Sequence, residues 1–447
     1  MEMERPVPMD ISSHLPRLLG VLLLTAAALW GQVSSSKTVR HHRVAEQDAS
    51  QPVELTQAEA AIEKKDYATA ETLLTKVTAA QPSNYQAWFD LGFVYNASGR
   101  TDDAIAAYRR SVTAKPDVFE SNLNLGLTMA KGKQPGAEEV LRAATRLKPQ
   151  NRIDEGRAQA WLGLGHVLEE SDPSAAIEAF REAAALQPKD PEPRLSAGLL
   201  LEKQNKFAEA EEQYKQVLTV DPSSEDALVG LANVYMRGQR FPEAEEYLRK
   251  VVNQRPNEAA PHIQLGRVLA ADQKYDEAAL ELQAGLKITP GDTSAQTDLA
   301  EVLFSAGKYA DAETLYRTLL SSRMQDPELH HKFGQVLMKQ KKFADAEREF
   351  LTAVKLKPDW GEAYGDLAVA ANEMQDYALA IKALDVRAKY LPELPVGYFL
   401  RATAYDHLRN FQEAAANYHL FLQVANGKYP DQEWQARHRL IAIEPKK

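Results

Sequence analysis

The strongest constraint on the fold is a pattern of residue types that recurs along the chain with a period of 34 residues. In the clearest copies a small residue follows a leucine, an alanine follows further on, and a proline closes the unit. Four copies carry it at Trp88, Leu91, Gly92, Tyr95, Ala104, Tyr108 and Pro116; at Leu228, Leu231, Ala232, Tyr235, Ala244, Leu248 and Pro256; at His262, Leu265, Gly266, Leu269, Ala278, Leu282 and Pro290; and at Tyr364, Leu367, Ala368, Ala371, Ala380, Leu384 and Pro392. A period of this length indicates a solenoid of helix pairs.

Each copy predicts two helices joined by a short turn. The first half has apolar residues at i, i+3 and i+7, which is one face of a helix. Prolines such as Pro256 follow the second half, where a missing N–H ends a helix. The tripeptide Asn96-Ala97-Ser98 matches a glycosylation acceptor, but it falls at the predicted end of a first helix, and we interpret it as that terminus.

The spacing W-x2-L-G-x2-Y, then A-x3-Y/F, then proline, resembles the tetratricopeptide repeat. About eleven copies begin near Gln51, Tyr85, Phe119, Ala158, Pro191, Glu225, Ala259, Thr293, Pro327, Gly361 and Pro395. The resemblance implies an all-α fold, a right-handed α-solenoid (superhelix) of about eleven helix-turn-helix units over residues 51–424. Residues 150–155 precede the fourth copy as an insertion and are expected to lengthen its first helix.

The family usually closes with a capping helix, and residues 425–447 are expected to supply this helix and a tail. Asp431 is a candidate N-cap for it. Trp434, His438 and Ile441 would then share one helix face.

The N-terminal region carries a separate signal. Residues 18–30, LLGVLLLTAAALW, are apolar without a charge, which suits a signal peptide and is short for a membrane span. We expect a signal peptide in residues 1–32, a polar linker in residues 33–50, and a periplasmic or secreted protein without a membrane span once the signal is removed. The alternative is an anchor in the inner membrane formed by residues 18–30.

Composition and motifs argue against several functions. The 447 residues carry a net charge of −10, which disfavours binding to nucleic-acid phosphates. There is no cysteine, so disulfides and thiolate chemistry are excluded. Two histidine pairs invite a metal interpretation. His41-His42 lies in the expected linker, and His330-His331 falls at the start of the ninth copy, where adjacent helical residues point to different faces. With no nucleophile, phosphate-loop or metalloprotease motif, the chain is expected to be no enzyme and to hold neither cofactor nor metal.

The resemblance instead implies a groove lined by the first helices, with positions two, five, nine, twelve and thirteen of each copy facing the ligand. The candidate partner-binding residues at these positions are Phe89, Phe93, Leu123, Leu127, Leu162, His166, Leu195, Leu199, Asn233, Arg237 and Arg267. An exposed apolar strip usually marks a binding site. The alternative is that these side chains pack between helices and only shape the groove.

The expected function is therefore a non-catalytic scaffold that binds a protein or peptide partner, in a bacterial cell envelope. The alternatives are a membrane-tethered adaptor and a carbohydrate-binding protein of a polysaccharide-export system that uses aromatic residues such as Phe89, Phe304 and Phe399. A clamp for chaperone tails is not expected, because Val229 and Gln264 occupy positions where that clamp has lysine and asparagine.

Overall fold

A computed structural model describes residues 52–444 of the chain. The regular structure in this part consists of 23 helices, α2 to α24, and no strand occurs among the described residues. The all-α prediction is therefore confirmed. The predicted signal peptide and linker, residues 1–32 and 33–50, and the His41-His42 pair lie outside the described residues.

The helices alternate as first and second members of successive pairs, and the chain divides within α13 (Phe241–Gln254) into two compact units. In the unit of residues 52–251 the first helices are α2 (Val53–Glu63), α4 (Tyr85–Ala97), α6 (Phe119–Lys131), α8 (Ile153–Leu168), α10 (Glu192–Lys203) and α12 (Glu225–Arg237). The second helices that precede α13 are α3 (Tyr67–Ala80), α5 (Thr101–Ala114), α7 (Ala137–Arg146), α9 (Pro173–Leu186) and α11 (Phe207–Val220).

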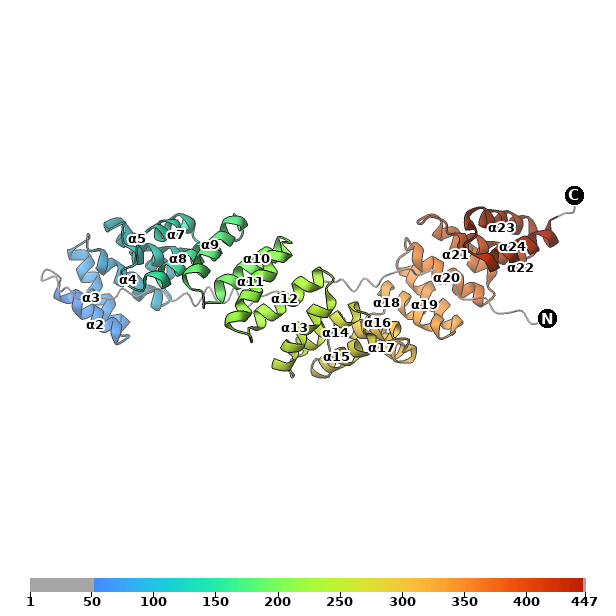
Figure 1. Ribbon diagram of the computed structural model, residues 1–447, viewed down its shortest axis with the longest axis horizontal. Helices are drawn as coiled ribbons and strands as arrows, with labels where there is room; N and C mark the ends of the chain where they lie inside the picture. The colour runs from blue at the N-terminus through green and yellow to red at the C-terminus, as the bar shows by residue number, and fades with distance from the viewer. Residues whose placement is uncertain (1–51, 445–447) are drawn as a thin grey trace. The chain divides into compact units, whose positions relative to one another are not determined.

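The unit of residues 252–444 repeats the same alternation (Figure 1). Its first helices are α14 (Ala259–Ala271), α16 (Thr293–Ser305), α18 (Pro327–Lys339), α20 (Gly361–Glu373), α22 (Pro395–His407) and the final α24 (Pro430–Ile443). Its second helices are α15 (Tyr275–Ile288), α17 (Tyr309–Ser322), α19 (Phe343–Leu356), α21 (Tyr377–Arg387) and α23 (Phe411–Ala425).

Within each unit a helix packs against the next one along the chain, so that the pairs stack. Several successive first helices also touch directly: α2 and α4, α6 and α8, α10 and α12 in one unit, and α14 and α16, α18 and α20, α20 and α22 in the other. In each unit the first helices thus lie side by side and present one surface, the first-helix face of that unit. The predicted solenoid of helix pairs is confirmed in each unit.

Local sequence explains where the helices begin and turn. The side chain of Asn84 accepts a hydrogen bond from the backbone N–H of Ala87 at 3.0 Å, which caps α4. At the turn after α14, Gln273 has a left-handed φ of 61°, and the N–H of Lys274 reaches back to the carbonyl of Leu269 at 2.8 Å. This closure satisfies carbonyls that a helix end would leave unpaired.

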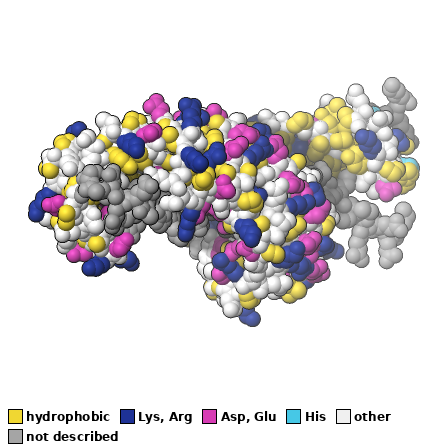
Figure 2. Space-filling view, turned by 60° about the vertical axis from the view of Figure 1, so that its left-hand side comes forward, with side chains coloured by type: hydrophobic (Ala, Val, Ile, Leu, Met, Phe, Trp, Pro, Cys, Tyr) yellow, Lys and Arg dark blue, Asp and Glu magenta, His cyan; other side chains and the backbone are white. Residues whose placement is uncertain are grey.

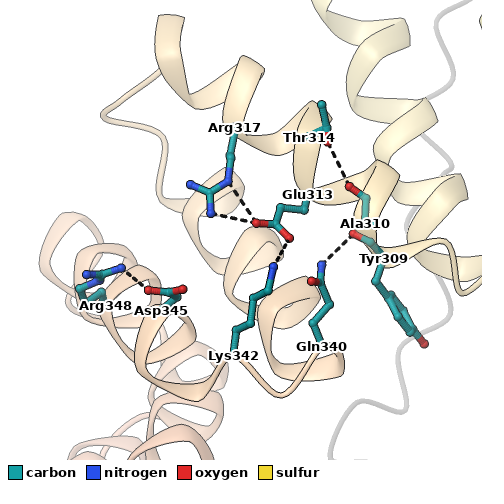
Figure 3. Close-up of polar contacts among 9 residues, drawn as sticks. All are labelled: Tyr309, Ala310, Glu313, Thr314, Arg317, Gln340, Lys342, Asp345 and Arg348. Carbon is teal, nitrogen blue, oxygen red and sulfur yellow. Dashed lines mark hydrogen bonds and ion pairs between the residues drawn. The ribbon is translucent and has the colours of Figure 1, made fainter.

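Ion pairs form between one helix pair and the next. Figure 3 shows Glu313 of α17 accepting hydrogen bonds from Arg317 on its own helix and from Lys342, which precedes α19, at 2.8 and 2.7 Å. A glutamate on a second helix meets a cation 29 residues later in two other places, Glu71 with Arg100 and Glu211 with Arg240. The hydrogen bond from Lys342, helped by Arg317 and opposed by burial, lowers the pKa of Glu313 to about 2.

Two local predictions are confirmed and one is wrong. The insertion lengthens the fourth first helix, because α8 has 16 residues where α4 has 13. The helix end near Asn96-Ala97-Ser98 is also confirmed, since α4 ends at Ala97. Asp431 is not the N-cap of the final helix: α24 starts at Pro430, whose fixed φ suits the first helical position, and Tyr429 precedes it without a side-chain cap.

Candidate partner-binding site

The predicted apolar residues of α4 and α6 are mostly buried. Phe89 is 3% exposed and packs against Tyr108 with ring centroids 5.7 Å apart, and Leu123 is fully buried. Leu127 is also buried, and Gly163 of α8 gives it room, since a Cβ at residue 163 would lie 2.5 Å from Leu127 Cδ2. Phe93 is partly exposed. An exposed strip through Phe89, Leu123 and Leu127 is therefore wrong, because these side chains pack between helices.

The predicted residues of α8 and α10 also differ from one another in burial. Leu195 is buried, whereas Leu162, His166 and Leu199 keep part of their surface. The partly exposed residues are the ones that a partner could contact on the first-helix face.

His166 lies between two carboxylates. Its Nδ1 is 2.8 Å from Glu169 Oε1, its Nε2 is 3.7 Å from Glu192 Oε1, and its ring meets Phe180 edge-on with centroids 5.1 Å apart. Burial on its own would lower the pKa of His166, but hydrogen bonding and attraction to Glu169 and Glu192 outweigh it and raise the pKa to about 9. The ring is therefore a cation at neutral pH.

Two of the predicted polar residues, Arg267 and Arg237, lie beside acidic residues of neighbouring first helices. Arg267 of α14 donates from Nε to Asp298 Oδ2 of α16 at 2.7 Å, and Arg237 Nε of α12 lies 3.7 Å from Glu202 Oε1 of α10. Asn233 is partly buried on α12. Both guanidinium groups thus have an acidic partner on a neighbouring first helix of the same chain.

This charge pairing continues along the first-helix face. Lys332 of α18 lies 3.7 Å from Glu301 of α16, and His331 Nε2 of α18 is 2.8 Å from Asp366 Oδ2 of α20. Burial raises the pKa of Glu202 and of Asp298, with the opposing arginines only partly offsetting it. Removing one member of a buried pair would leave the other charge without its partner, which is costly.

A cavity of about 330 Å³ opens where α22, α23 and α24 meet. It is lined by Phe399, Thr403, Tyr418, Trp434, Gln435, His438, Arg439 and Ala442. Phe399 and Tyr418 form buried walls, whereas Trp434 is 59% exposed, and the ring centroids of Trp434 and His438 are 3.9 Å apart. Arg439 is held by Asp406, from Nη2 to Oδ1 at 2.8 Å.

The residues from α24 were missed as site residues. Trp434 and His438 follow Phe399 and Thr403 by 35 residues each, so α24 stands in register as a further first helix. Trp434, His438 and Ile441 do share one face, as predicted, but this face is exposed, with Ile441 at 75%. Figure 2 shows hydrophobic side chains gathered near histidine toward the right-hand end of that view. The spacing of 35 residues is the signal that could have found them.

Metal and membrane sites have no support among the described residues. Within residues 52–444 no group of three or more histidine, aspartate or glutamate side chains is placed to hold a metal ion. His330 and His331 diverge as expected, toward Glu349 and Asp366. Across the same range, none of the helices is both long and apolar enough to span a bilayer.

Family models match most of the chain. The model of the cilia and flagella-associated protein 70 C-terminal domain matches residues 38–297, and two tetratricopeptide-repeat models match residues 269–332 and 331–395. Two Arabidopsis thaliana proteins are similar over short stretches. The protein CTR9 homolog is 34% identical over 103 residues, 23% of this chain and 9% of that protein, and the protein NPGR1 is 27% identical over 121 residues, 26% of this chain and 17% of that protein. The chain thus spans under a fifth of either relative.

Two solved structures show some similarity to the chain. YrrB, described as a TPR protein with an unusual peptide-binding site, is 22% identical, with a TM-score of 0.39 over 42% of this chain and 96% of its own. Yeast Tom70 is 15% identical, with a TM-score of 0.33 over 89% of this chain and 96% of its own. The chain belongs to the tetratricopeptide-repeat family and, over residues 38–297, to the family of the cilia and flagella-associated protein 70 C-terminal domain.

Proposed function

We propose that the chain is a non-catalytic scaffold that holds a partner protein segment on its first-helix face, with the cavity between α22 and α24 as an anchor point. Family membership supports the first part, because tetratricopeptide repeats generally serve as non-catalytic protein-interaction scaffolds. The cavity supports the second part.

The observation that carries the proposal is the exposed indole of Trp434 above buried aromatic walls. Binding sites are concave and mostly apolar with a few polar groups for orientation. Phe399 and Tyr418 supply the apolar wall, and Thr403 and Gln435 supply polar atoms. An apolar side chain of a partner peptide would bury the indole, and buried tryptophans often dominate the binding energy of an interface.

The test uses peptides selected from a displayed random library against the full chain. We expect Trp434→Ala to weaken the selected peptides by about tenfold or more, which corresponds to the loss of roughly 1.4 kcal/mol. The matched control is Leu280→Ala on α15, which removes a side chain that is 66% exposed and lies outside the cavity. Equal affinities for the wild type and Trp434→Ala would contradict the anchor.

A carbohydrate partner is the second candidate, because an exposed indole beside the amide of Gln435 also suits a sugar ring. The same two variants serve in gel retardation with soluble polysaccharides. If polysaccharide retards the wild type but not Trp434→Ala, and the library yields no binding peptide, the carbohydrate proposal would replace the peptide proposal.

We further propose that residues 18–30 direct export to a bacterial cell envelope, either as a cleaved signal or as a retained tether. The support is the uncharged apolar sequence of these residues. Intact-mass measurement of the protein from a membrane-bounded compartment separates the two, because cleavage near residue 32 removes a defined mass. Recovery of the whole chain only from the cytosol would contradict export.

A further inference from the structure

Two histidines at equivalent places in two repeats bridge three parts of the chain. His262 of α14 has Nε2 3.1 Å from the carbonyl oxygen of Pro256, in the loop before the helix, and Nδ1 2.7 Å from Glu281 Oε2 of α15. The ring of His262, which is carried by the first helix α14, therefore contacts both the preceding loop and the second helix α15.

The second histidine repeats the first one 68 residues later. His330 of α18 has Nε2 3.0 Å from the carbonyl oxygen of Met324 and Nδ1 2.6 Å from Glu349 Oε2 of α19. Every member of the second group follows its counterpart by two repeat periods.

The chemistry of the two neighbours decides the protonation state that fits. A carbonyl and a carboxylate only accept hydrogen bonds, whereas a neutral imidazole has a single N–H donor. Only the doubly protonated ring can donate to both oxygens at once. The side chains of His262 and His330 are 12% and 13% exposed, so water replaces a lost partner poorly.

Other repeats make the same contact to the loop with donors that do not titrate near neutral pH. Trp88 donates to the carbonyl of Pro82 at 3.0 Å, Asn122 to that of Pro116 at 2.9 Å, and Gln296 to that of Pro290 at 2.7 Å. In the repeat between the two histidines, Gln296 takes the histidine position and Leu315 takes the glutamate position. The loop contact is thus common to these repeats, and the histidines are its titratable form.

Each of the two loops that precede α14 and α18 carries an ion pair of its own. In the loop before α14, Arg255 lies 3.2 Å from Glu258, and in the loop before α18, Arg323 pairs with Asp326. His331 adjoins His330 but turns to Asp366 of α20. Glu281 and Glu349 are therefore the carboxylates that face the two rings from the packed second helices.

We propose that His262 and His330 are paired pH-sensitive clasps, which fasten the helix pairs α14–α15 and α18–α19 to their preceding loops when protonated and release one contact each when neutral. Histidine is the side chain that ordinarily changes charge between pH 5 and 8. The inference concerns regulation of the solenoid and does not depend on the proposed binding function.

The test is amide hydrogen exchange of the full chain at pH about 5.5 and about 8, corrected for the intrinsic exchange rate. We expect α14–α15 and α18–α19 to exchange about three- to tenfold faster at the higher pH, which is the net effect of one hydrogen bond. The repeat α16–α17, with Gln296, serves as the internal control. In the double variant His262→Gln, His330→Gln the pH-dependent part should disappear, because glutamine keeps the donor to the carbonyl.

A pH dependence that survives in the double variant, or is equal in α16–α17, would overturn the proposal. Nitrogen NMR of the wild-type rings provides a readout that does not require a folded variant. We expect both ring nitrogens of His262 and His330 to be protonated at pH about 5.5. A single protonated nitrogen on each ring at pH about 5.5 would also overturn it.

Discussion

Gly92 of α4 lies directly against the ring of Tyr108 on α5: a Cβ built on Gly92 would be 2.6 Å from Tyr108 Cδ1. The side chain of Tyr108 is fully buried. This contact explains why the sequence pattern has a small residue at this position, even though a glycine within a helix costs about 1 kcal/mol relative to alanine.

We expect Gly92→Ala to lower the free energy of unfolding by about 1–2 kcal/mol, because overpacking of the buried ring outweighs the gain in helix propensity. Gly291→Ala is the matched control, since a Cβ at residue 291 meets no atom within 4 Å. Urea denaturation of both variants measures the difference. A Gly92→Ala protein as stable as the wild type would show that α4 and α5 are not held at this distance.

Phe89 and Phe93 lie one helical turn apart on α4 but differ in burial, so their substitution distinguishes a packing residue from a residue that a partner could contact. Phe89 is buried against Tyr108, whereas Phe93 keeps part of its surface. We expect Phe89→Asp to cost about 3 kcal/mol or more and Phe93→Asp less than half of that, because only the first buries a charge in the core. Thermal unfolding followed by circular dichroism compares them, and equal losses would contradict the assigned burial.

Glu313 makes the free energy of unfolding depend on pH in the acidic range. Hydrogen bonding from Lys342, opposed by burial and helped by Arg317, lowers the pKa of Glu313 to about 2. A lowered pKa stabilises the folded state above the unfolded value of roughly 4.3, and this contribution is lost as the pH falls through about 2. We expect the stability advantage over Glu313→Gln to be of order 1–3 kcal/mol at pH 6 and to vanish near pH 2.

Denaturant midpoints between pH 2 and 6 check this, with Glu362→Gln, an exposed residue of α20, as the control. A difference between the wild type and Glu313→Gln that stays constant over this range would mean that the ion pair with Lys342 does not form in solution.

His166 gives the opposite dependence. Its pKa is raised to about 9 because Glu169 and Glu192 outweigh the effect of burial. A raised pKa stabilises the folded state fully below the unfolded value of roughly 6.5, and the contribution is lost as the pH rises through about 9. We expect the wild type to exceed His166→Gln in stability at pH 6 and to match it near pH 10. The urea midpoints of the two proteins between pH 6 and 10 test this prediction. A stability difference between the wild type and His166→Gln that increases with pH would contradict it.

Periodicity was sufficient to predict the helix pairs, because the spacing of small and aromatic residues reflects contacts inside one pair, such as Gly92 with Tyr108. Burial on the first-helix face was not predictable in this way. It depends on how closely neighbouring pairs approach, and Gly163 lets Leu127 of the preceding pair enter. Repeat position does not report that distance.

The polar candidates show the same limit. Arg267 stands at a predicted groove position, yet its guanidinium is occupied by Asp298, 31 residues away. Trp434 was assigned to a capping helix because the resemblance implies such a helix after the last repeat. Its place beside Phe399 in a cavity emerges only when α24 packs on α22 and α23.

The most direct test of the account is a hydrogen-exchange footprint of a library-selected peptide on the full chain. The account predicts that the bound peptide slows exchange in α22 and α24, around Phe399 and Trp434, and leaves the exposed side of second helices such as α15 unchanged. Protection confined to second helices, with α22 and α24 unaffected, would contradict binding on the first-helix face.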